Sequence, residues 1–415
     1  MKIRSLTLEN FKSFKKLEIK EFLDVNMIYG YNNSGKSNLL KFLELVFSSS
    51  ENTREIEVTV EGQPRTVKQT ETENFWQKSI YNMPYIFRRE AGKKHNIVFS
   101  IFIEVTKDEL RKALADLYEP LEKECITSPG DSVDVIIEGK ITTLGDNNAQ
   151  QSLTKVVLDG KDIFELDVDG NIKTFEGFKH LTFGHFTNLM AYFNDCVLLL
   201  DNDRYFVNEK EVHDGKKLHS KNFKNTLFND TLSHAKEEEL SKLITFLRKF
   251  KIESEDGVIK NNEKSSPFNE FSFEFGRFND EIEIMLKNDF GRFPLSSFGT
   301  GIQQLVYILS RIFLGNKKIV LIEEIELNLS PRYQTELINF FYQKLIKGDK
   351  SIDQLFYTTH SPLMCFRTEF RSMQTRIDAE GISTVEKIVL LPEDVQKFKI
   401  AHNLLEKYPD PQPKK

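Results

Sequence analysis

The sequence predicts an α/β fold, and three stretches carry this prediction. The first is GYNNSGKSNLL, from Gly30 to Leu40, which fits the spacing G-x-x-x-x-G-K-[ST]. The second is KKIVLIEEIELNLSP, in which two acidic residues end an apolar run, and the third is QLFYTTHSPLM, in which Thr359, His360 and Ser361 end another. Uncharged runs of this length are typical of parallel strands that are buried on both faces.

Composition limits the classes of protein that fit. The 415 residues, 39% hydrophobic and 29% charged, can bury a large core in two lobes or domains. No apolar run reaches the roughly 18 residues of a membrane span, and the N-terminus lacks the apolar segment of a signal peptide. Cys125, Cys196 and Cys365 are too widely separated to indicate a disulfide framework. We therefore expect a cytoplasmic protein without membrane contacts.

The stretch from Gly30 to Leu40 is expected to bind a nucleotide phosphate. An alternating strand pattern, DVNMIYG, precedes it, and apolar residues at helical spacing follow it. In a strand, loop and helix of this kind the backbone N–H groups and the helix N-terminus point at phosphate oxygens. Lys36 would reach the β- and γ-phosphates, and Ser37 would ligate Mg²⁺. The expected nucleotide-binding residues here are Gly30, Asn32, Asn33, Ser34, Gly35, Lys36, Ser37 and Asn38.

Polar residues at three further places fit the same chemistry. The stretch PLSSFGTGIQQLVYILSRIF joins a small-residue loop to an amphipathic helix, which predicts a second helix start that faces phosphate. Glu323 and Glu324 end a buried strand, so Glu323 could hold Mg²⁺ while Glu324 deprotonates the attacking water. His360 could hydrogen-bond a γ-phosphate. Each place also has a structural alternative. Glu323 and Glu324 could form an ordinary acidic loop, the small-residue loop could be only a helix-start turn, and His360 could cap the turn before Pro362.

Taken in order, the P-loop, LSSFGTGIQQ, LIEEIELNLSP and TTHSP resemble the ATPase heads of the RecF, SMC-like and OLD (overcoming lysogenization defect) group. The opening IRSLTLENFKSFKKLEI supports the resemblance, because that group has a similar NFKSF pattern before the P-loop. The similarity covers residues 1–50 and 290–365. It implies a P-loop NTPase head of ABC type that binds ATP and Mg²⁺ and hydrolyses ATP to ADP and phosphate.

The resemblance also assigns roles. It makes Gly30 to Ser37 the Walker A loop, Ser297 to Gly299 the signature, and Asn328 to Pro331 the D-loop. Glu323 and Glu324 take the place of Walker B and its catalytic acid, and His360 that of the switch histidine. The implied catalytic residues are thus Glu324, His360 and Lys36; Ser297 and Gly299 join the nucleotide-binding set; and Ser37 and Glu323 bind the metal.

Three positions qualify this assignment. Many members have Asp where this sequence has Glu323, and relatives often have Pro where it has Ile325. Either Ser296 or Ser297 can be the signature serine, and the S-x-G spacing favours Ser297.

The resemblance also implies how copies of the chain assemble. In such heads the signature of one protomer faces the γ-phosphate held by another, which implies a homodimer or a higher homo-oligomer formed around ATP.

The middle of the chain is expected to be an insertion. Lys36 and Ser297 lie 261 positions apart, and the intervening sequence has no sustained heptads of a coiled coil. TKDELRKALADLYEPLEKE predicts one helix with a capping box at Thr106 and Glu109, stopped or kinked near Pro120. Strands follow in SVDVIIEGKITT, TKVVLDG and DIFELDVDGNIKTF, with turns at Asp159/Gly160 and Asp169/Gly170, and then a helix at 237–250. These patterns favour a compact mixed α/β insertion in place of a long coiled coil.

The predicted domains are residues 1–105 and 285–392 for the two parts of the ATPase head, 106–284 for the insertion, and 393–415 for a C-terminal helix and tail. Only 55 residues follow His360, among them a strand from Ser383 to Leu391. The TOPRIM nuclease of OLD proteins needs on the order of 100 residues. We therefore expect a stand-alone ATPase subunit with a separate effector protein, a layout that the resemblance associates with bacterial anti-phage systems.

DNA contacts and the cellular role stay open. The basic runs FRREAGKKH and KKLHSKNFK are typical of solvated surface, with phosphate contacts as the alternative, and the net charge of −6 excludes a uniformly basic coat. The acids in LLLDNDRYF favour a structural loop over a metal site. Three functions are compatible with these features: an ATP-hydrolysing sensor that controls a nuclease or toxin, a RecF-like DNA-repair ATPase, and a non-catalytic scaffold that ATP holds together.

Overall fold

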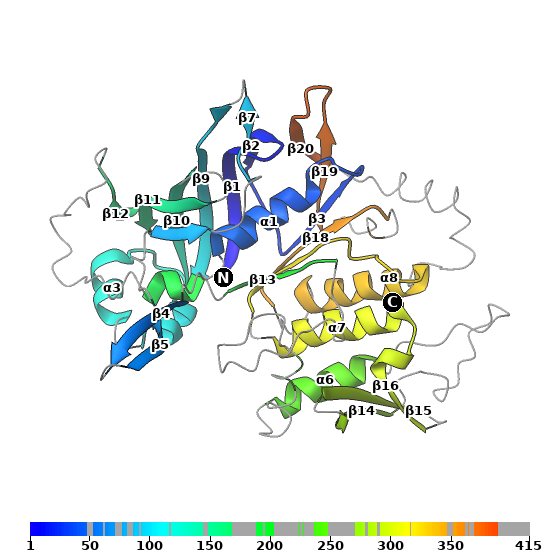
Figure 1. The fold of residues 1–415 in the computed structure, drawn as a ribbon. Helices are drawn as coiled ribbons and strands as arrows, with labels where there is room; N and C mark the ends of the chain where they lie inside the picture. The colour runs from blue at the N-terminus through cyan, green and yellow to red at the C-terminus, as the bar shows by residue number, and fades with distance from the viewer. Residues whose placement is uncertain are drawn as a thin grey trace. The chain divides into compact units, whose positions relative to one another are not determined.

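The computed structural model divides the chain into two compact units (Figure 1). Unit one comprises Met1–Leu23, Gly30–Val197 and Gln374–Glu386, and unit two comprises Asp24–Tyr29, Leu198–Met373 and Lys387–Lys415. The residues that the structure describes are 1–47, 53–60, 63–70, 77–80, 86–90, 93–115, 118–143, 148–167, 188–193, 196–202, 224, 227, 236–247, 270–278, 281–288, 291–315, 317–346, 352–361, 364 and 369–388. The predicted domain boundaries at 105, 284 and 392 stay predictions.

Unit one is built on an antiparallel sheet. Its strands lie in the order β12-β11-β10-β9-β1-β2, and β6 pairs with β11. Their bounds are β1 Lys2–Phe11, β2 Phe14–Ile19, β6 Gln77–Ile80, β9 Ile97–Thr106, β10 Ser132–Thr143, β11 Ala149–Leu158 and β12 Lys161–Glu165. Two separate hairpins pair β4 (Thr53–Val60) with β5 (Gln63–Thr70) and β7 (Arg89–Glu90) with β8 (Lys93–Lys94).

One face of this sheet forms the core of unit one because its strands alternate. In β9 every second residue is buried, as period-two side chains on a half-buried strand require. Helix α1 (Lys36–Phe47) packs there: the ring of Phe42 lies edge-on to Phe11, at 5.2 Å between centroids, and to Phe99, at 5.6 Å. The side chain of Gln151 on β11 donates to the Val46 carbonyl near the end of this helix, at 3.4 Å. The helix that follows the P-loop is thereby fixed on the sheet.

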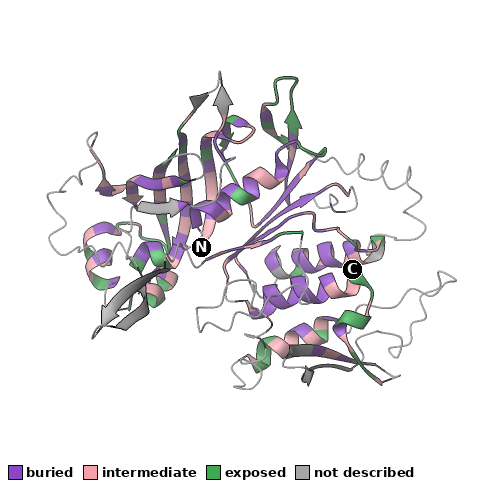
Figure 2. Cartoon of the chain, in the orientation of Figure 1, coloured by how far each residue is buried: buried purple, intermediate pink, exposed green. Residues whose placement is uncertain are grey.

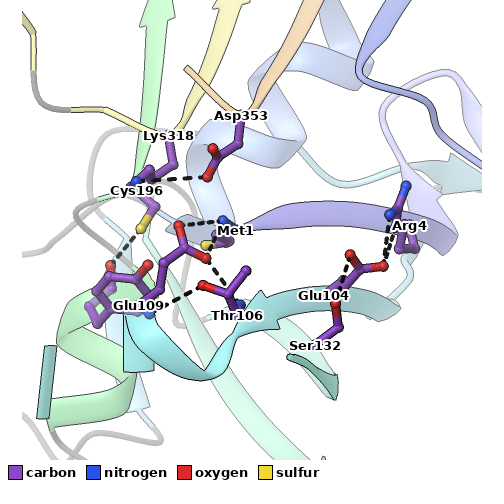
Figure 3. Close-up of polar contacts among 10 residues, drawn as sticks. Met1, Arg4, Glu104, Thr106, Glu109, Ser132, Cys196, Lys318 and Asp353 are labelled. Carbon is purple, nitrogen blue, oxygen red and sulfur yellow. Dashed lines mark hydrogen bonds and ion pairs between the residues drawn. The ribbon is translucent and has the colours of Figure 1, made fainter. Parts of the chain in front are cut away.

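The predicted capping box is confirmed, but the position predicted for the helix break is wrong. Thr106 Oγ1 accepts from the Glu109 N–H and Glu109 accepts from the Thr106 N–H, while Met1 N donates to both Glu109 carboxylate oxygens at 2.8 Å (Figure 3). Two helices follow, α2 (Lys107–Leu114) and α3 (Tyr118–Cys125). The break begins at Ala115, whose φ of 46° leaves the helix. Pro120 lies inside the first turn of α3, where its missing N–H costs no helical hydrogen bond.

The predicted strands and the first predicted turn of the insertion are confirmed where the structure describes them. β11 and β12 are joined by Asp159 and Gly160, both with positive φ, 51° and 79°. These are the signs that a two-residue type I′ hairpin turn requires, and Asp-Gly is a favoured pair for it. The second predicted turn, Asp169/Gly170, lies outside the described residues.

Unit two contains a parallel sheet with β3 (Val25–Gly30), β17 (Ile319–Ile322) and β18 (Gln354–Thr359) as neighbours in the order β17-β18-β3. Ile322 pairs with Tyr357, and Thr359 pairs with Tyr29, so the carboxyl ends of all three strands lie at the same edge. Strand β13 (Val197–Leu200) flanks β17. Strands β19 (Arg371–Ile377) and β20 (Ser383–Ile388) lie mostly in unit one, which contains Gln374–Glu386. The three strands are buried almost throughout, as the uncharged runs predicted.

Helices and a small meander complete unit two. The helices are α6 (Glu237–Leu247), α7 (Thr300–Leu314) and α8 (Pro331–Phe341), and the antiparallel meander is β14 (Glu270–Phe278), β15 (Glu281–Asn288) and β16 (Gly291–Pro294). A 3₁₀ turn, Leu295–Ser297, precedes α7, and a π-helical segment, Tyr342–Ile346, follows α8. All residues of α7 from Gln304 to Leu314 are buried, and Figure 2 shows much of this helix in the buried colour. This stretch of α7 lies in the core of unit two, where it buries the polar Gln304, Ser310 and Arg311 together with its apolar residues.

The other expected elements are confirmed in part. The helix expected at 237–250 is described from 237 to 247, and the strand expected from Ser383 to Leu391 is described to Ile388. The expected C-terminal helix and tail lie outside the described residues. No helix in the described part of the chain is long and apolar enough to cross a membrane. Cys125 and Cys196 are free and buried.

Candidate functional site

The P-loop has the backbone of a phosphate-binding turn. It continues directly from β3 in the sequence and ends in the first turn of α1, which begins at Lys36. Asn33 and Gly35 have positive φ, 61° and 99°, a combination that leads the chain tightly into the helix. The Asn38 N–H donates to the Gly35 carbonyl at 3.1 Å. The predicted order of strand, loop and helix is confirmed.

Lys36 lies over the loop that it belongs to. Its Nζ donates to the Gly30 carbonyl at 2.9 Å and to the Tyr31 carbonyl at 2.8 Å, and the residue is 5% exposed. These two hydrogen bonds hold the Lys36 ammonium against the backbone of the loop that is predicted to bind phosphate. Of the other predicted loop residues, Ser34 and Gly35 are buried, Ser37 and Asn38 are half-buried, and Asn32 and Asn33 are exposed.

Three hydroxyl residues from outside the predicted site touch this loop. Ser34 Oγ and Thr375 Oγ1 share a hydrogen bond of 2.5 Å. Asn38 Nδ2 donates to Ser13 Oγ at 2.9 Å, and the Ser383 N–H donates to the Ser13 carbonyl at 2.9 Å. Ser13 belongs to the NFKSF pattern in the turn between β1 and β2, whereas Thr375 and Ser383 come from β19 and β20.

In unit two the predicted acidic pair follows β17 directly. Glu323 is 4% exposed, and its N–H donates to the Leu200 carbonyl of β13 at 2.9 Å. Glu324 has φ 43°, and its N–H donates to Thr358 Oγ1 at 2.8 Å. This left-handed conformation is rare for a residue with a side chain and turns Glu324 sharply away from the direction of the strand. The two neighbouring carboxylates are thereby separated: one is buried and the other is one-third exposed.

His360 follows β18 and lies beside Glu324. Its Nε2 is 3.7 Å from Glu324 Oε1, and both side chains are about one-third exposed. The His360 N–H donates to Glu326 Oε1 at 2.5 Å, which fixes the backbone just before the imidazole. The structure thus brings together the two residues that the sequence predicted as the catalytic acid and the switch histidine.

The predicted D-loop, Asn328 to Pro331, is hydrogen-bonded through Gln334 to the segment after β18 within unit two. Gln334, 8% exposed on α8, donates through Nε2 to the Leu329 carbonyl at 2.9 Å and accepts from Ser361 Oγ at 2.6 Å. Ser330 caps α8 by accepting from the Tyr333 N–H, and Pro331 takes the first helical position. One buried side chain thus connects Ser361, the residue after His360, to Leu329 in the predicted D-loop.

The predicted signature residues lie in an exposed turn before α7. Ser296, Ser297, Gly299 and Thr300 are all exposed, and Ser297 Oγ donates to the Pro294 carbonyl at 2.7 Å. Gln303 Nε2 donates to the Phe298 carbonyl at 2.7 Å, which holds the turn from inside the helix. Gly299 is the N-cap of α7 and has no side chain, so no side-chain hydrogen bond caps the first N–H groups of this helix.

Sequence reasoning missed Thr358, Glu326 and Gln334 in unit two, and Thr375 and Ser383 in unit one. Their residue types are common, and no spacing rule singles them out, although Thr358, Glu326 and Ser13 lie in stretches that the resemblance quoted. Several predicted features lie outside the described residues: Pro362, Asp203, Arg204 and the basic run at 216–223. Asp201, from the acidic stretch after β13, is exposed.

Comparison with known proteins places the chain in a family. A family model described as AAA ATPase domain matches residues 1–365. The chain belongs to the AAA ATPase domain family. This match confirms the predicted ATPase family.

Relatives of this AAA ATPase are distant. An ATP/GTP phosphatase of Helicobacter pylori (strain ATCC 700392 / 26695) is 23% identical over 367 residues, which are 86% of this chain and 85% of the relative. Among solved structures, the SMC head domain from Thermotoga maritima has a TM-score of 0.42 and 13% identity and covers 94% of this chain and 100% of its own. An SmcHead bound to the C-winged helix domain of ScpA has a TM-score of 0.49 and 14% identity, with 96% and 100% covered.

Proposed function

We propose that this AAA ATPase binds ATP at the loop Gly30–Ser37 and hydrolyses it to ADP and phosphate, with Glu324 as the general base. One observation carries the proposal: within unit two β17, β18 and Val25–Tyr29 of β3 run parallel, and Glu323, His360 and the loop that begins at Gly30 each follow one of these strands in the sequence. Ligands of α/β proteins bind at the edge where parallel strands end. The family match over residues 1–365 supports the same reading.

Each residue would have a defined task. The Lys36 ammonium exchanges the carbonyls of Gly30 and Tyr31 for β- and γ-phosphate oxygens, so its charge is already in place when the nucleotide arrives. The Glu324 carboxylate accepts the proton of the attacking water, and His360, 3.7 Å from it, donates to the γ-phosphate or to the water. The positive φ of Glu324 and its hydrogen bond to Thr358 fix where that carboxylate lies.

The donor set fits Mg²⁺. Ser37 offers a hydroxyl and Glu323 a carboxylate, and hard oxygen donors are the ligands that this ion prefers. Among the described residues, no group of three or more His, Cys, Asp or Glu side chains could hold a metal ion by itself. Phosphate oxygens and water would therefore complete the shell, as is usual for Mg²⁺ at nucleotide sites. When bound, the ion neutralises charge on the β- and γ-phosphates.

Turnover of nucleotide by the purified full chain tests this proposal. We would measure phosphate release from ATP and from GTP, because the H. pylori relative carries both nucleotides in its name. Lys36→Ala should remove turnover and nucleotide binding. The matched control is Lys20→Ala, since the Lys20 side chain is 85% exposed and contacts Glu18 at the surface. Equal turnover by wild type and Lys36→Ala would exclude this loop as the site.

We further propose that ATP joins two or more copies of the chain. The exposed turn with Ser297 and Gly299, and the N-terminus of α7 without a side-chain cap, would cover the γ-phosphate bound to another copy. Glu324→Gln should then accumulate an ATP-bound oligomer, because the nucleotide binds and is not hydrolysed. The molar mass of the protein in solution, measured by light scattering in ATP and in ADP, tests this proposal. A monomer in both nucleotides would contradict it.

The final part of the proposal is regulatory. An ATP-dependent change in oligomeric state would control a separate effector, a nuclease or toxin, in anti-phage defence; the resemblance to the RecF, SMC-like and OLD group supports this role. Binding to duplex DNA ends or gaps that depends on ATP and weakens with salt would favour a repair ATPase instead. An oligomer that forms in ATP without turnover would favour a scaffold.

A further inference from the structure

The C-terminal hairpin β19–β20 supplies buried hydroxyl residues to the P-loop. Both strands lie beyond residue 365, where the family match ends. Thr375 and Ser383 are each 0% exposed, although they belong to a short hairpin whose tip, from Asp378 to Gly381, is exposed. The buried end of the hairpin thus faces the loop within unit one, and the exposed end faces solvent.

Thr375 contacts the first half of the loop. Its hydroxyl and that of Ser34 share a hydrogen bond of 2.5 Å, and Ser34 is 1% exposed. A Cβ on Gly30 would lie 2.6 Å from the Thr375 carbonyl and 2.7 Å from Ser34 Oγ, so the strand backbone is in direct contact with the start of the loop. Only a glycine at position 30 permits this approach.

Ser383 contacts the second half of the loop together with Ser13. Gly35 has φ +99°, and a Cβ there would lie 2.7 Å from Ser383 Oγ and 3.1 Å from Ser13 Oγ. The Ser383 N–H donates to the Ser13 carbonyl, and Asn38 Nδ2 donates to Ser13 Oγ, each at 2.9 Å. The glycine that precedes Lys36 is therefore enclosed between two serine side chains from opposite ends of the chain.

We propose that Thr375 and Ser383 are positioning residues that hold the P-loop in its phosphate-binding conformation. The inference rests on the proposed function, because it concerns how the same loop binds its nucleotide. A loop rich in glycine and small polar residues loses much conformational entropy when it is ordered around a phosphate. Contacts that order it beforehand remove that cost from binding, so they raise affinity without touching the nucleotide.

The first test is the affinity of the full chain for Mg²⁺ and a fluorescent ATP analogue, measured beside its melting temperature. Thr375→Val keeps the side-chain shape and removes the hydroxyl that Ser34 contacts. Because the loss of one hydrogen bond of ordinary net strength weakens binding by about 2- to 12-fold, we expect an effect of this size for Thr375→Val. Thr375→Ser keeps the hydroxyl and should bind like wild type. Ser372→Ala is the matched control, because it removes a buried hydroxyl from the same strand.

A double-mutant cycle separates positioning from general stability. Ser34→Ala breaks the same hydrogen bond from the loop side, so Ser34→Ala and the double variant with Thr375→Val should bind equally weakly. Ser34→Ala also keeps the inference testable if Thr375→Val does not fold. Ser383→Val adds bulk beside Gly35 and should weaken binding more than Ser383→Ala does. The inference is overturned if these variants lower the melting temperature and leave the affinity unchanged, or if the two single effects simply add.

The outcomes also separate this inference from the proposed function. If wild type itself binds no nucleotide, both the proposed function and the inference are wrong. If wild type binds and hydrolyses ATP while Thr375→Val binds it equally well, the ATPase stands and only the role of the hairpin is excluded.

Discussion

The backbone N–H of Glu324 donates to the hydroxyl of Thr358 at 2.8 Å, and this bond holds Glu324 at φ 43°. Thr358 is fully buried in β18. Thr358→Val removes the acceptor and leaves the Glu324 backbone free to relax toward an ordinary conformation. We expect kcat for ATP to fall about 10-fold, the effect of a lost hydrogen bond that orients a general base, with little change in KM.

Thr358→Ser is the control for this prediction, since it keeps the hydroxyl and should restore most of kcat. Steady-state phosphate release at saturating and limiting ATP separates the two constants. A rise in KM with unchanged kcat would assign Thr358 to nucleotide binding rather than to the placement of Glu324.

Gly301 in the first turn of α7 lies against the backbone of Asn328, in the predicted D-loop. A Cβ there would lie 2.5 Å from the Asn328 carbonyl oxygen, whereas a Cβ on Gly299 would meet nothing within 4 Å. Gly301→Ala must displace backbone and should lower the free energy of unfolding by about 1–3 kcal/mol. Gly299→Ala, two residues away, should change it far less. Urea unfolding of both variants decides this, and equal stability would mean that α7 and the D-loop move apart freely.

The hairpin turn at Asp159 should lose stability in acid. Partial burial raises the pKa of the Asp159 carboxyl, but hydrogen bonds from Ser128 and Thr127 outweigh it, so the pKa lies below its ordinary value of 3.8. The stabilisation is therefore present above pH 3.8 and is lost as pH falls through the lower folded-state pKa. Asp159→Asn, which tolerates the same positive φ, should cost about 1 kcal/mol at pH 7. The difference from wild type should shrink as the pH is lowered, and a constant difference would contradict the prediction.

Cys125 should stay protonated and unreactive in the folded protein. Burial raises the pKa of its thiol from 9.0 to about 11, with Glu124 adding to the effect. The folded state then holds a proton that the unfolded state releases, so the free energy of unfolding falls as pH rises from 9 to about 11. Cys125→Ala should remove this part of the pH dependence. Urea unfolding between pH 8 and 10 measures it, and identical pH profiles for the two proteins would contradict the assignment.

Contiguous motifs could be predicted from the sequence because their chemistry is local. A strand, a glycine-rich turn and a helix follow one another in Gly30 to Phe47, and the acidic pair and His360 each end an uncharged run. The capping box at Thr106 and the turn at Asp159 are likewise complete within a few residues. Each of these features is settled by neighbours in the chain, so its residue pattern is enough.

Features that depend on distant segments could not be predicted. Thr375 and Ser383 contact the loop from more than 300 positions away in the sequence, and nothing in RSMQTRI or STVEKI marks a serine or threonine as special. The sequence predicts a helix break near Pro120 because proline usually ends or kinks a helix, whereas the break lies at Ala115. Proline is tolerated in a first helical turn, and which residue begins that turn is decided by tertiary packing.

The central place of β3 in its sheet has a consequence for how the protein is made. Val25 pairs with Leu355 and Tyr29 with Thr359, so the strand that leads into the P-loop has no parallel partner until the ribosome has synthesised β18. Pairings of such high contact order form slowly, and an unpaired apolar strand is prone to aggregate. The nascent chain would thus carry its nucleotide-binding segment unfinished through most of translation. Nucleotide binding during synthesis would then report that the carboxyl-terminal strands have docked.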